Sequence, residues 1–488
     1  MGDKKLGRSL TMKAIFLLSL VFALGFSRAA ATFDESRADA KLTPLEAKAL
    51  QLIEGVMFAK EEEMLPLHTT YTPACLGLNQ SLPPPPAKWK GRCDFNETHC
   101  NNKIIDARNF VPSRNGRPPF YEEGHGTHTA STVAGNFGKG ANAFEMADGT
   151  AVGMASLAHL SIYRVCINAL CPETAILAGI DAAVSDGVDI LSLSLGAPEL
   201  SFIKIEVAVG AFGAIQEGIF VTCSAGNQGP TGKTLSNEAP WVLTVGVSTV
   251  DRTMSATVQL GNGAEYQGQS IFQPQDFYSR VLPLVYAGAS GDSSSAQCYP
   301  GDHDYCDILT RDKKPILAEK LRPANYFATG VGHVAPARAN HPGLIYDIRP
   351  GDYIPYLCGL GYKDAEVSVI AHRNIVCSQI PSIPEAQLNY PSISIVFGLS
   401  PQNYTRAVTN VGPANSSYTC RIHASAGVDV KVSPSVITFS GTHQTATYTV
   451  TFSKKPGSSN VNQYSQGSLL WVSNRRHFAR RLIAVTFQ

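Results

Sequence analysis

Between residues 160 and 247 the chain alternates apolar strand-like runs with segments of helical spacing, and this alternation restricts the fold more than any other feature. The expected strands are 160–165, 188–195, 219–223 and 242–247, and the expected helices are 174–185 and 202–216. Consecutive parallel strands need a crossover connection, which is usually a helix. We therefore expect an α/β domain whose sheet is mainly parallel and is flanked by helices.

The character of the sequence changes after about residue 385. Short β-branched runs at 393–397, 418–422 and 447–451 alternate with stretches of Gly, Pro, Asn and Ser. Turn residues at such intervals are typical of a β-sandwich. We expect residues 385–488 to form a separate all-β domain.

The N-terminus has the composition of a secretory signal peptide. Basic residues precede an apolar run over 14–26, which ends at the small residues Ala29–Ala31. A membrane anchor is the alternative, but a spanning helix needs about 20 apolar residues and this run is shorter. We expect residues 1–31 to be a signal peptide, and the protein to be secreted and extracellular without a stable membrane anchor. Four sequons would then be glycosylation acceptors, at Asn79, Asn96, Asn403 and Asn415.

Eleven cysteines agree with an oxidising compartment. The pairs that are close along the chain are candidates for disulfides: Cys93/Cys100, Cys166/Cys171 and Cys358/Cys377. The odd total leaves one thiol, and Cys223, inside an apolar run, is the candidate for a free buried one. No pair has the repeated Cys-x-x-Cys spacing of a structural zinc site, so we expect no metal.

Charge gives little indication of a partner. The formal net charge is +1, and the chain has no long run of one sign. A basic patch is typical of proteins that bind nucleic acid or lie on a membrane surface. We therefore expect no nucleic-acid partner, and the sequence leaves the oligomeric state open.

The segment Gly124–Ser131 contains the strongest candidate for chemistry. It places His125 between two glycines at the start of a helix-like run of small residues. A histidine in that position is open to a neighbour, as a general base must be. His125 and His128 could instead be metal ligands on one helical turn, although no acidic or cysteine partner stands at ligand spacing. Either could also be an ordinary structural histidine.

The loop Ser224–Pro230 follows an apolar strand directly. Its Asn227 carries an amide that could donate a hydrogen bond to a developing oxyanion. The alternative is an ordinary Asn/Gly turn, which is common. Taken alone, this loop favours the turn.

Together, three segments in their order and spacing resemble the subtilisin-like fold: His125–Ser131, Leu193–Gly196 and Ser224–Pro230. Over most of residues 42–488 the chain resembles the plant subtilases, with further matches at 67–73, 76–78, 86–91, 100–105, 328–334, 342–347, 388–392 and 406–412. The resemblance implies part of a propeptide at 32–68, a subtilisin-like catalytic domain at 69–380 with an incomplete parallel sheet, and a fibronectin-III-like β-sandwich at 385–488.

The resemblance also implies an activity and the residues that perform it. The activity would be that of a serine endopeptidase, which hydrolyses secreted proteins or peptides without a cofactor. His125 would be the base of the catalytic triad, and Asn227 would be the oxyanion-hole donor. The residues along which a substrate lies as an added strand would be Ser194, Leu195, Gly196, Ala225 and Gly226.

Two parts of the family pattern have no counterpart in this chain. The family's aspartate stands in Asp-Thr-Gly or Asp-Ser-Gly upstream of the histidine, and its serine stands in Gly-Thr-Ser-Met; none of these motifs occurs. Sequence that matches the family stops near residue 78 and resumes at 83, and it stops again near 298 and resumes at 306. The catalytic Asp and Ser are therefore absent as whole blocks, together with the family's protease-associated insert.

Three interpretations follow from these gaps. The gaps could reflect skipped exons or a wrongly assembled gene, in which case the intact protein would be an active endopeptidase. The chain could be a pseudoprotease that binds peptides without cleaving them, or a truncated product that does not fold stably. In subtilisin, loss of the serine alone lowers turnover by about 10⁶, so we expect the chain as written to be inactive.

Overall fold

A computed structural model describes most of the chain from residue 82 onward, together with the backbone of a short strand before it. The described residues are 55–60, 82–94, 100–111, 124–143, 146–166, 170–196, 201–229, 234–247, 255–269, 282–283, 316, 324, 326–334, 339–398, 401–423, 426–455, 464–474 and 477–487. The expected signal peptide and the sequons at Asn79 and Asn96 lie outside these residues.

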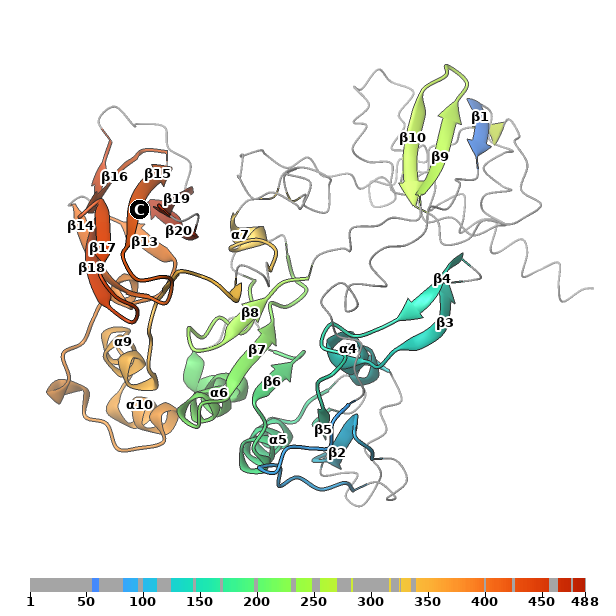
Figure 1. The fold of residues 1–488 in the computed structure, drawn as a ribbon, viewed down its shortest axis with the longest axis horizontal. Coiled ribbons are helices and arrows are strands. Elements are labelled where there is room, and N and C mark those ends of the chain that lie inside the picture. The colour runs from blue at the N-terminus through green and yellow to red at the C-terminus, as the bar shows by residue number, and fades with distance from the viewer. Residues whose placement is uncertain are drawn as a thin grey trace, which may run out of the picture.

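Parallel strands form an α/β layer, as the sequence predicts (Figure 1). One sheet has the order β6 (Ile190–Leu193), β7 (Phe220–Ser224) and β8 (Leu243–Val245), and all its pairs are parallel. A second parallel pair consists of β2 (Ile104–Asn109) and β5 (Leu160–Arg164). The expected fold class is thereby confirmed for this part of the chain.

Two helices connect these strands. α5 (Glu173–Asp186) joins β5 to β6, and α6 (Glu206–Gln216) joins β6 to β7. α5 buries Ile176, Ile180 and Ala183, which its helical spacing places on one face. It ends at Gly187, whose φ of 83° lies in the left-handed region that glycine adopts without strain.

The parallel layer is open at two places. Within the described residues, β5 pairs only with β2, and β6 pairs only with β7. One face of the three-stranded sheet also exposes apolar side chains, since Ile190 is 61%, Phe220 54% and Leu243 49% exposed. Parallel sheets are normally covered on both faces, and the exposed side chains show that this face is only partly covered. The incomplete sheet stays a prediction.

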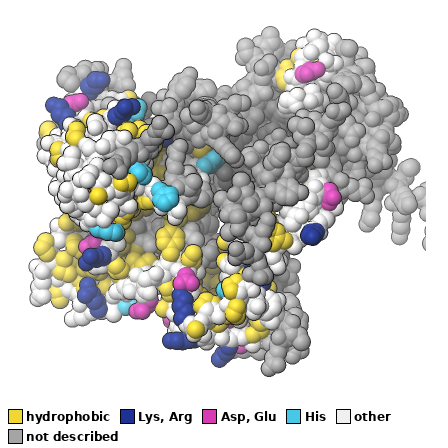
Figure 2. All heavy atoms as spheres, in the orientation of Figure 1, with side chains coloured by type: hydrophobic (Ala, Val, Ile, Leu, Met, Phe, Trp, Pro, Cys, Tyr) yellow, Lys and Arg dark blue, Asp and Glu magenta, His cyan; other side chains and the backbone are white. Residues whose placement is uncertain are grey.

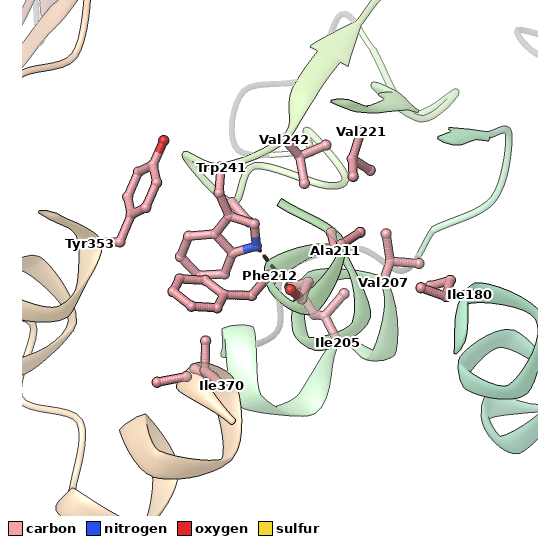
Figure 3. Close-up of a cluster of buried hydrophobic side chains, with 14 of the residues drawn as sticks. Ile180, Ile205, Val207, Ala211, Phe212, Val221, Trp241, Val242, Tyr353 and Ile370 are labelled. Atoms are coloured by element: carbon pink, nitrogen blue, oxygen red, sulfur yellow. Dashed lines mark hydrogen bonds between the residues drawn. The ribbon is translucent and has the colours of Figure 1, made fainter. Parts of the chain in front are cut away.

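The other face of the sheet is covered by a continuous hydrophobic core (Figure 3). Trp241 packs edge-on against both Phe212 of α6 and Tyr353, with ring centroids 5.2 Å and 5.6 Å apart. Its indole N–H donates to the carbonyl oxygen of Ala208 at 2.9 Å. Ile370 belongs to the same core. The core therefore joins the sheet to α9 (Tyr353–Gly359) and α10 (Asp364–Ala371).

Other elements lie around this layer. α4 (His125–Ala134) precedes a hairpin of β3 (Gly138–Ala143) and β4 (Met146–Ala151), and α7 (Tyr326–Thr329) is a single turn. An antiparallel sheet has the order β10 (Glu265–Gln269), β9 (Ser255–Leu260), β1 (Gly55–Lys60) and β11 (Leu282–Pro283). The segment assigned to a partial propeptide thus contributes one strand to a sheet with residues more than 190 positions away in sequence.

The C-terminal region is a β-sandwich, as the sequence predicts. Its strands are β13 (Ile393–Phe397), β14 (Gln402–Asn410), β15 (Ser416–His423), β16 (Val428–Ser433), β17 (Val436–Phe439), β18 (Thr445–Lys454), β19 (Tyr464–Ser473) and β20 (Phe478–Phe487). One sheet has the order β13-β20-β19-β15-β17, and the other contains β14, β18 and β16. Alternate residues of β13 are buried and exposed, which is the pattern of a strand with one face on a core.

The sandwich also includes a strand from outside residues 385–488. β12 (Leu344–Ile345) pairs antiparallel with Asn410 and Thr409 of β14, and Leu344 belongs to the sandwich core. Asp347 just beyond it accepts a hydrogen bond from the Thr409 hydroxyl. The sandwich therefore begins before the boundary that composition alone indicates.

All three candidate cysteine pairs form disulfides in the structure: Cys93–Cys100, Cys166–Cys171 and Cys358–Cys377. Cys223 is free and buried, and burial raises the pKa of its thiol to about 12. Cys420 is a second free cysteine, which the sequence did not single out.

The surface has no dominant charge on the face drawn in Figure 2, where Lys and Arg are interspersed with Asp and Glu over the described atoms. Among the described helices, none is long and apolar enough to cross a membrane.

Candidate active site

His125 is the first residue of α4, and its side chain is exposed. Gly124, directly before it, has a φ of 79°, so the turn into the helix uses the left-handed conformation that favours glycine. Among the described residues, no carboxylate forms an ion pair or hydrogen bond with the His125 imidazole. The ring is therefore accessible, and none of the described carboxylates orients it as the acidic partner of a triad base would.

The two aspartates that precede His125 in the described chain are engaged elsewhere. Asp94 pairs with Arg92 at 3.2 Å. Asp106 on β2 is fully buried, accepts a hydrogen bond from the Arg92 backbone N–H at 2.9 Å, and lies 3.3 Å from an Arg108 guanidinium nitrogen. Neither carboxylate forms an ion pair or hydrogen bond with the His125 imidazole.

Asp106 belongs to a buried charged cluster between β2 and the end of α5. Arg108 bridges Asp106 and Asp186, and its guanidinium lies over the ring of Tyr163, 5.1 Å from the centroid. Tyr163 donates to Asp186 at 2.7 Å. Burial raises the pKa of Asp106 to about 6, and it outweighs Arg108 and the Arg92 backbone N–H, which lower it. We therefore expect this cluster to make the stability of the fold depend on pH.

His128 is also exposed on α4. Over the described residues, no group of three or more His, Cys, Asp or Glu side chains is placed to hold a metal ion. The backbone carbonyl oxygen of His128 accepts hydrogen bonds from the side-chain hydroxyls of Ser131 and Thr132, at 2.9 Å and 2.8 Å.

The two segments assigned to substrate binding lie at the same edge of the parallel sheet, the one where the strands have their carboxyl ends. Leu193 of β6 pairs with Cys223 of β7, so Ser194–Gly196 begins just beyond β6, and Ser224–Gly226 begins at the last residue of β7. Ser194 and Gly196 are exposed, and Leu195 is half-buried. The Ala225 N–H donates to the carbonyl oxygen of Val245 at 2.9 Å, which ties the second segment to β8.

Asn227 follows Gly226, whose φ is 86°. The Asn227 side chain is exposed, and its amide makes no hydrogen bond to the described part of the chain. Its backbone N–H donates to the Gln228 side-chain oxygen at 3.3 Å. The amide is therefore free to donate to a ligand placed along this edge.

Asn237 joins the two segments, and sequence reasoning did not identify it. Its side-chain Nδ2 donates to the carbonyl oxygens of Leu195 at 2.9 Å and Ser224 at 2.8 Å. In the sequence it is one asparagine in a short polar stretch before Ala239. Such residues commonly end turns, so nothing local marks it as a link between strands that are distant along the chain.

Comparison with known proteins identifies relatives over nearly the whole chain. Residues 387–485 match the model of the fibronectin type-III domain family. The chain is 27% identical to subtilisin-like protease SBT1.7 of Arabidopsis thaliana over 684 residues, covering 92% of this chain and 90% of that protein. Subtilisin-like protease SBT1.2 of the same plant is 27% identical over 691 residues, covering 92% and 89%. Subtilisin-like protease SBT1.4 is 28% identical over 692 residues, covering 91% and 88%.

These alignments are longer than this chain. The alignment with SBT1.7 runs over 684 residues, whereas this chain has 488. The alignment must therefore include positions of the relative for which this chain has no residue.

Proposed function

The chain belongs to the plant family of subtilisin-like proteases, and from that membership we propose that it is a secreted member that binds extended peptides without cleaving them. The family acts on protein or peptide substrates, and the ligand of this chain would be of the same class. The observation that carries the proposal is the sheet edge at the carboxyl ends of β6 and β7, formed by Ser194–Gly196 and Ser224–Gly226, where Ser194, Gly196 and Gly226 are exposed. An extended peptide can add to such an edge as a further strand, through its own backbone groups.

The edge has groups available for a peptide. Gly196 is exposed, and its backbone makes no hydrogen bond to the described part of the chain. The Asn227 amide stands free beyond the neighbouring strand end. A carbonyl of the bound peptide could accept from this amide, which is the contact that an oxyanion would strengthen in a complete enzyme.

Catalysis requires two groups that this chain lacks. Without the serine no acyl-enzyme forms, and without the aspartate the imidazole of His125 is not held in the tautomer that accepts the serine proton. In subtilisin the residual rate from the oxyanion hole and binding alone is about 10³–10⁴ over the uncatalysed reaction. The proposed function therefore keeps peptide binding and excludes rapid turnover.

The open parallel layer supports the same proposal. The family's missing segments are a strand that carries the aspartate and a helix that carries the serine. A layer without them would have unpaired strand edges and an uncovered face. Among the described strands β5 pairs only with β2 and β6 only with β7, and Ile190, Phe220 and Leu243 are exposed, which are features of that kind.

The form of the gaps favours a second candidate, an active endopeptidase whose transcript contains the missing segments. Well-matched sequence flanks both gaps, as block losses would leave it. Sequencing the transcript across codons 78–83 and 298–306 distinguishes the two. An in-frame Asp-Thr-Gly and Gly-Thr-Ser-Met would restore the enzyme, and an uninterrupted match to this sequence would exclude it.

The mode of binding is tested with N-methylated peptides. We expect a member of a panel of N-acetylated, C-amidated octapeptides to bind the full-length protein in fluorescence anisotropy. Methylation of an amide that faces the sheet edge should weaken binding about tenfold or more, because it removes a donor and adds a clash. Methylation of the next amide, which points away, should have little effect, because successive backbone N–H groups of a strand point to opposite sides in the plane of the sheet. Equal effects at every amide would contradict binding as an added strand.

Secretion is tested through glycosylation. Asn403 and Asn415 are exposed in the structure, so both sequons are accessible to a glycan. Protein produced in plant cells should reach the medium and lose apparent mass on treatment with an N-glycosidase. The double variant Asn403→Gln, Asn415→Gln should shift less, and Asn262→Gln, at an exposed asparagine outside any sequon, should shift like wild type. A cytosolic, glycan-free product would refute this part of the proposal.

A further inference from the structure

Asn237 lies beneath the exposed edge, between the two segments that form it. It is 3% exposed, and its φ of 60° places it in the left-handed region, which asparagine tolerates better than most residues. A buried polar side chain in that conformation persists only where its surroundings hold it. The contacts of its side chain show which parts of the chain it connects.

The side-chain amide of Asn237 contacts both segments at once. Nδ2 donates one hydrogen to the Leu195 carbonyl oxygen at 2.9 Å and the other to the Ser224 carbonyl oxygen at 2.8 Å. An amide nitrogen has two hydrogens, so both are used. One planar group therefore fixes the separation between the end of β6 and the end of β7.

The chemistry of the contact requires an amide. Two carbonyl oxygens face the same side-chain atom, so that atom must be a donor twice over. The Oδ1 atom of Asn237 is buried and has no hydrogen-bond partner. A carboxylate would place an acceptor against two acceptors and would lose both bonds.

The neighbouring residues fit the amide closely. A Cβ atom on Gly196 would lie 2.6 Å from Nδ2 of Asn237, so only glycine leaves room for it there. The backbone of Asn237 is anchored as well, because its carbonyl oxygen accepts from the Thr244 hydroxyl of β8 at 2.5 Å. Ser236 N–H donates to the Ala225 carbonyl oxygen at 3.0 Å. The amide is thus held rigidly between the two segments.

We infer that Asn237 is the positioning residue of the peptide-binding edge: its amide sets the spacing of Ser194–Gly196 relative to Ser224–Gly226. The inference rests on the proposed function, since the edge is the site at which a peptide would bind. Asn237 itself is buried and does not need to touch the peptide.

Two variants separate the amide from the backbone conformation. Asn237→Gly keeps the left-handed backbone but removes the amide, and Asn237→Asp keeps the shape but replaces the donor. The probe is the tightest-binding octapeptide of the panel, measured by fluorescence anisotropy on the full-length protein. We expect Asn237→Gly to weaken binding about tenfold, since two hydrogen bonds to the edge are lost.

Asn237→Asp supplies a pH-dependent readout that a loss of packing alone would not produce. At neutral pH this variant should bind the peptide at least as weakly as Asn237→Gly. As the pH falls, the new carboxyl becomes protonated and regains one O–H donor, so its affinity relative to wild type should rise severalfold. The affinity of Asn237→Gly relative to wild type should not change with pH, because the titrating groups that both proteins share affect both affinities equally.

Hydrogen exchange distinguishes this inference from the proposed function. In wild type, the amides of Ala225 and Ser236 should be protected, and in Asn237→Gly they should exchange about tenfold faster. If wild type binds no peptide but exchange still increases, the proposed function fails and the positioning role stands. If either variant binds like wild type, or the exchange rates do not change, the positioning role is refuted. Should Asn237→Gly not fold, the pH response of Asn237→Asp decides.

Discussion

Purified protein is expected to hydrolyse casein and a panel of chromogenic peptides no faster than a sample without enzyme, and His125→Ala is expected to leave that rate unchanged. This expectation follows from the proposal that the chain lacks the family's nucleophile. In subtilisin, loss of the serine alone costs about 10⁶ in turnover, and loss of the histidine together with the serine adds little. An imidazole with no serine to deprotonate has no catalytic step to perform.

A fluorophosphonate probe provides the matched control, because it labels only an activated serine. No label should appear on this chain, whereas a complete member of the family treated in parallel should be labelled. Turnover by wild type that His125→Ala abolishes would mean that another residue acts as the nucleophile. Our account of inactivity would then be wrong, and the family assignment would be unaffected.

The second large effect concerns Asp106 and pH. We expect the free energy of unfolding of wild type, relative to Asp106→Asn, to increase as the pH falls from 7 toward 4. The pKa of Asp106 is raised from 3.8 to about 6 in the folded protein. The folded state therefore binds this proton more tightly than the unfolded state does. The resulting stabilisation is fully present below pH 3.8 and is lost as the pH rises through about 6.

The size of this effect follows from the shift. One pKa unit corresponds to about 1.4 kcal/mol, so the relative free energy of unfolding should change by about 2.4 kcal/mol between pH 7 and pH 4, and by about 3 kcal/mol once the pH is well below 3.8. The cause is the burial of the carboxyl, which the Arg108 guanidinium only partly offsets. The matched control is Asp429→Asn on β16, where the carboxylate is half-exposed and lies 3.9 Å from Lys431.

The measurement is urea unfolding of the three proteins at a series of pH values. The Asp429→Asn variant should follow wild type. A difference between wild type and Asp106→Asn that does not depend on pH would contradict the raised pKa. A difference of the opposite sign, with wild type losing relative stability on acidification, would mean that Arg108 outweighs burial and depresses the pKa.

Periodic burial made much of the fold predictable from sequence. Helix α5 starts and ends within one residue of the expected 174–185, because its apolar residues recur along one face and Gly187 ends it. Strands β13, β15 and β18 fall on the expected β-branched runs. The place of His125 at the start of a helix was likewise predictable, because a glycine before a run of small residues is typical of a helix N-terminus.

Features that depend on contacts distant in sequence were not predictable in this way. The run 344–345 is too short to carry a period, so its place as β12 in the sandwich became evident only from its pairing with β14. Asn237 is another example, because its two acceptors lie 42 and 13 residues away. β5 and β6 belong to different sheets among the described strands. The apolar pattern of a single strand does not specify which other strand it pairs with, so this division was not predictable.

The central claim is that this chain binds an extended peptide and leaves it intact. Native mass spectrometry of the full-length protein, incubated for hours with the tightest-binding octapeptide, tests both parts in one measurement. The account predicts a one-to-one complex whose peptide keeps its full mass throughout. Free protein alone, or a complex in which the peptide is replaced by its fragments, would contradict it.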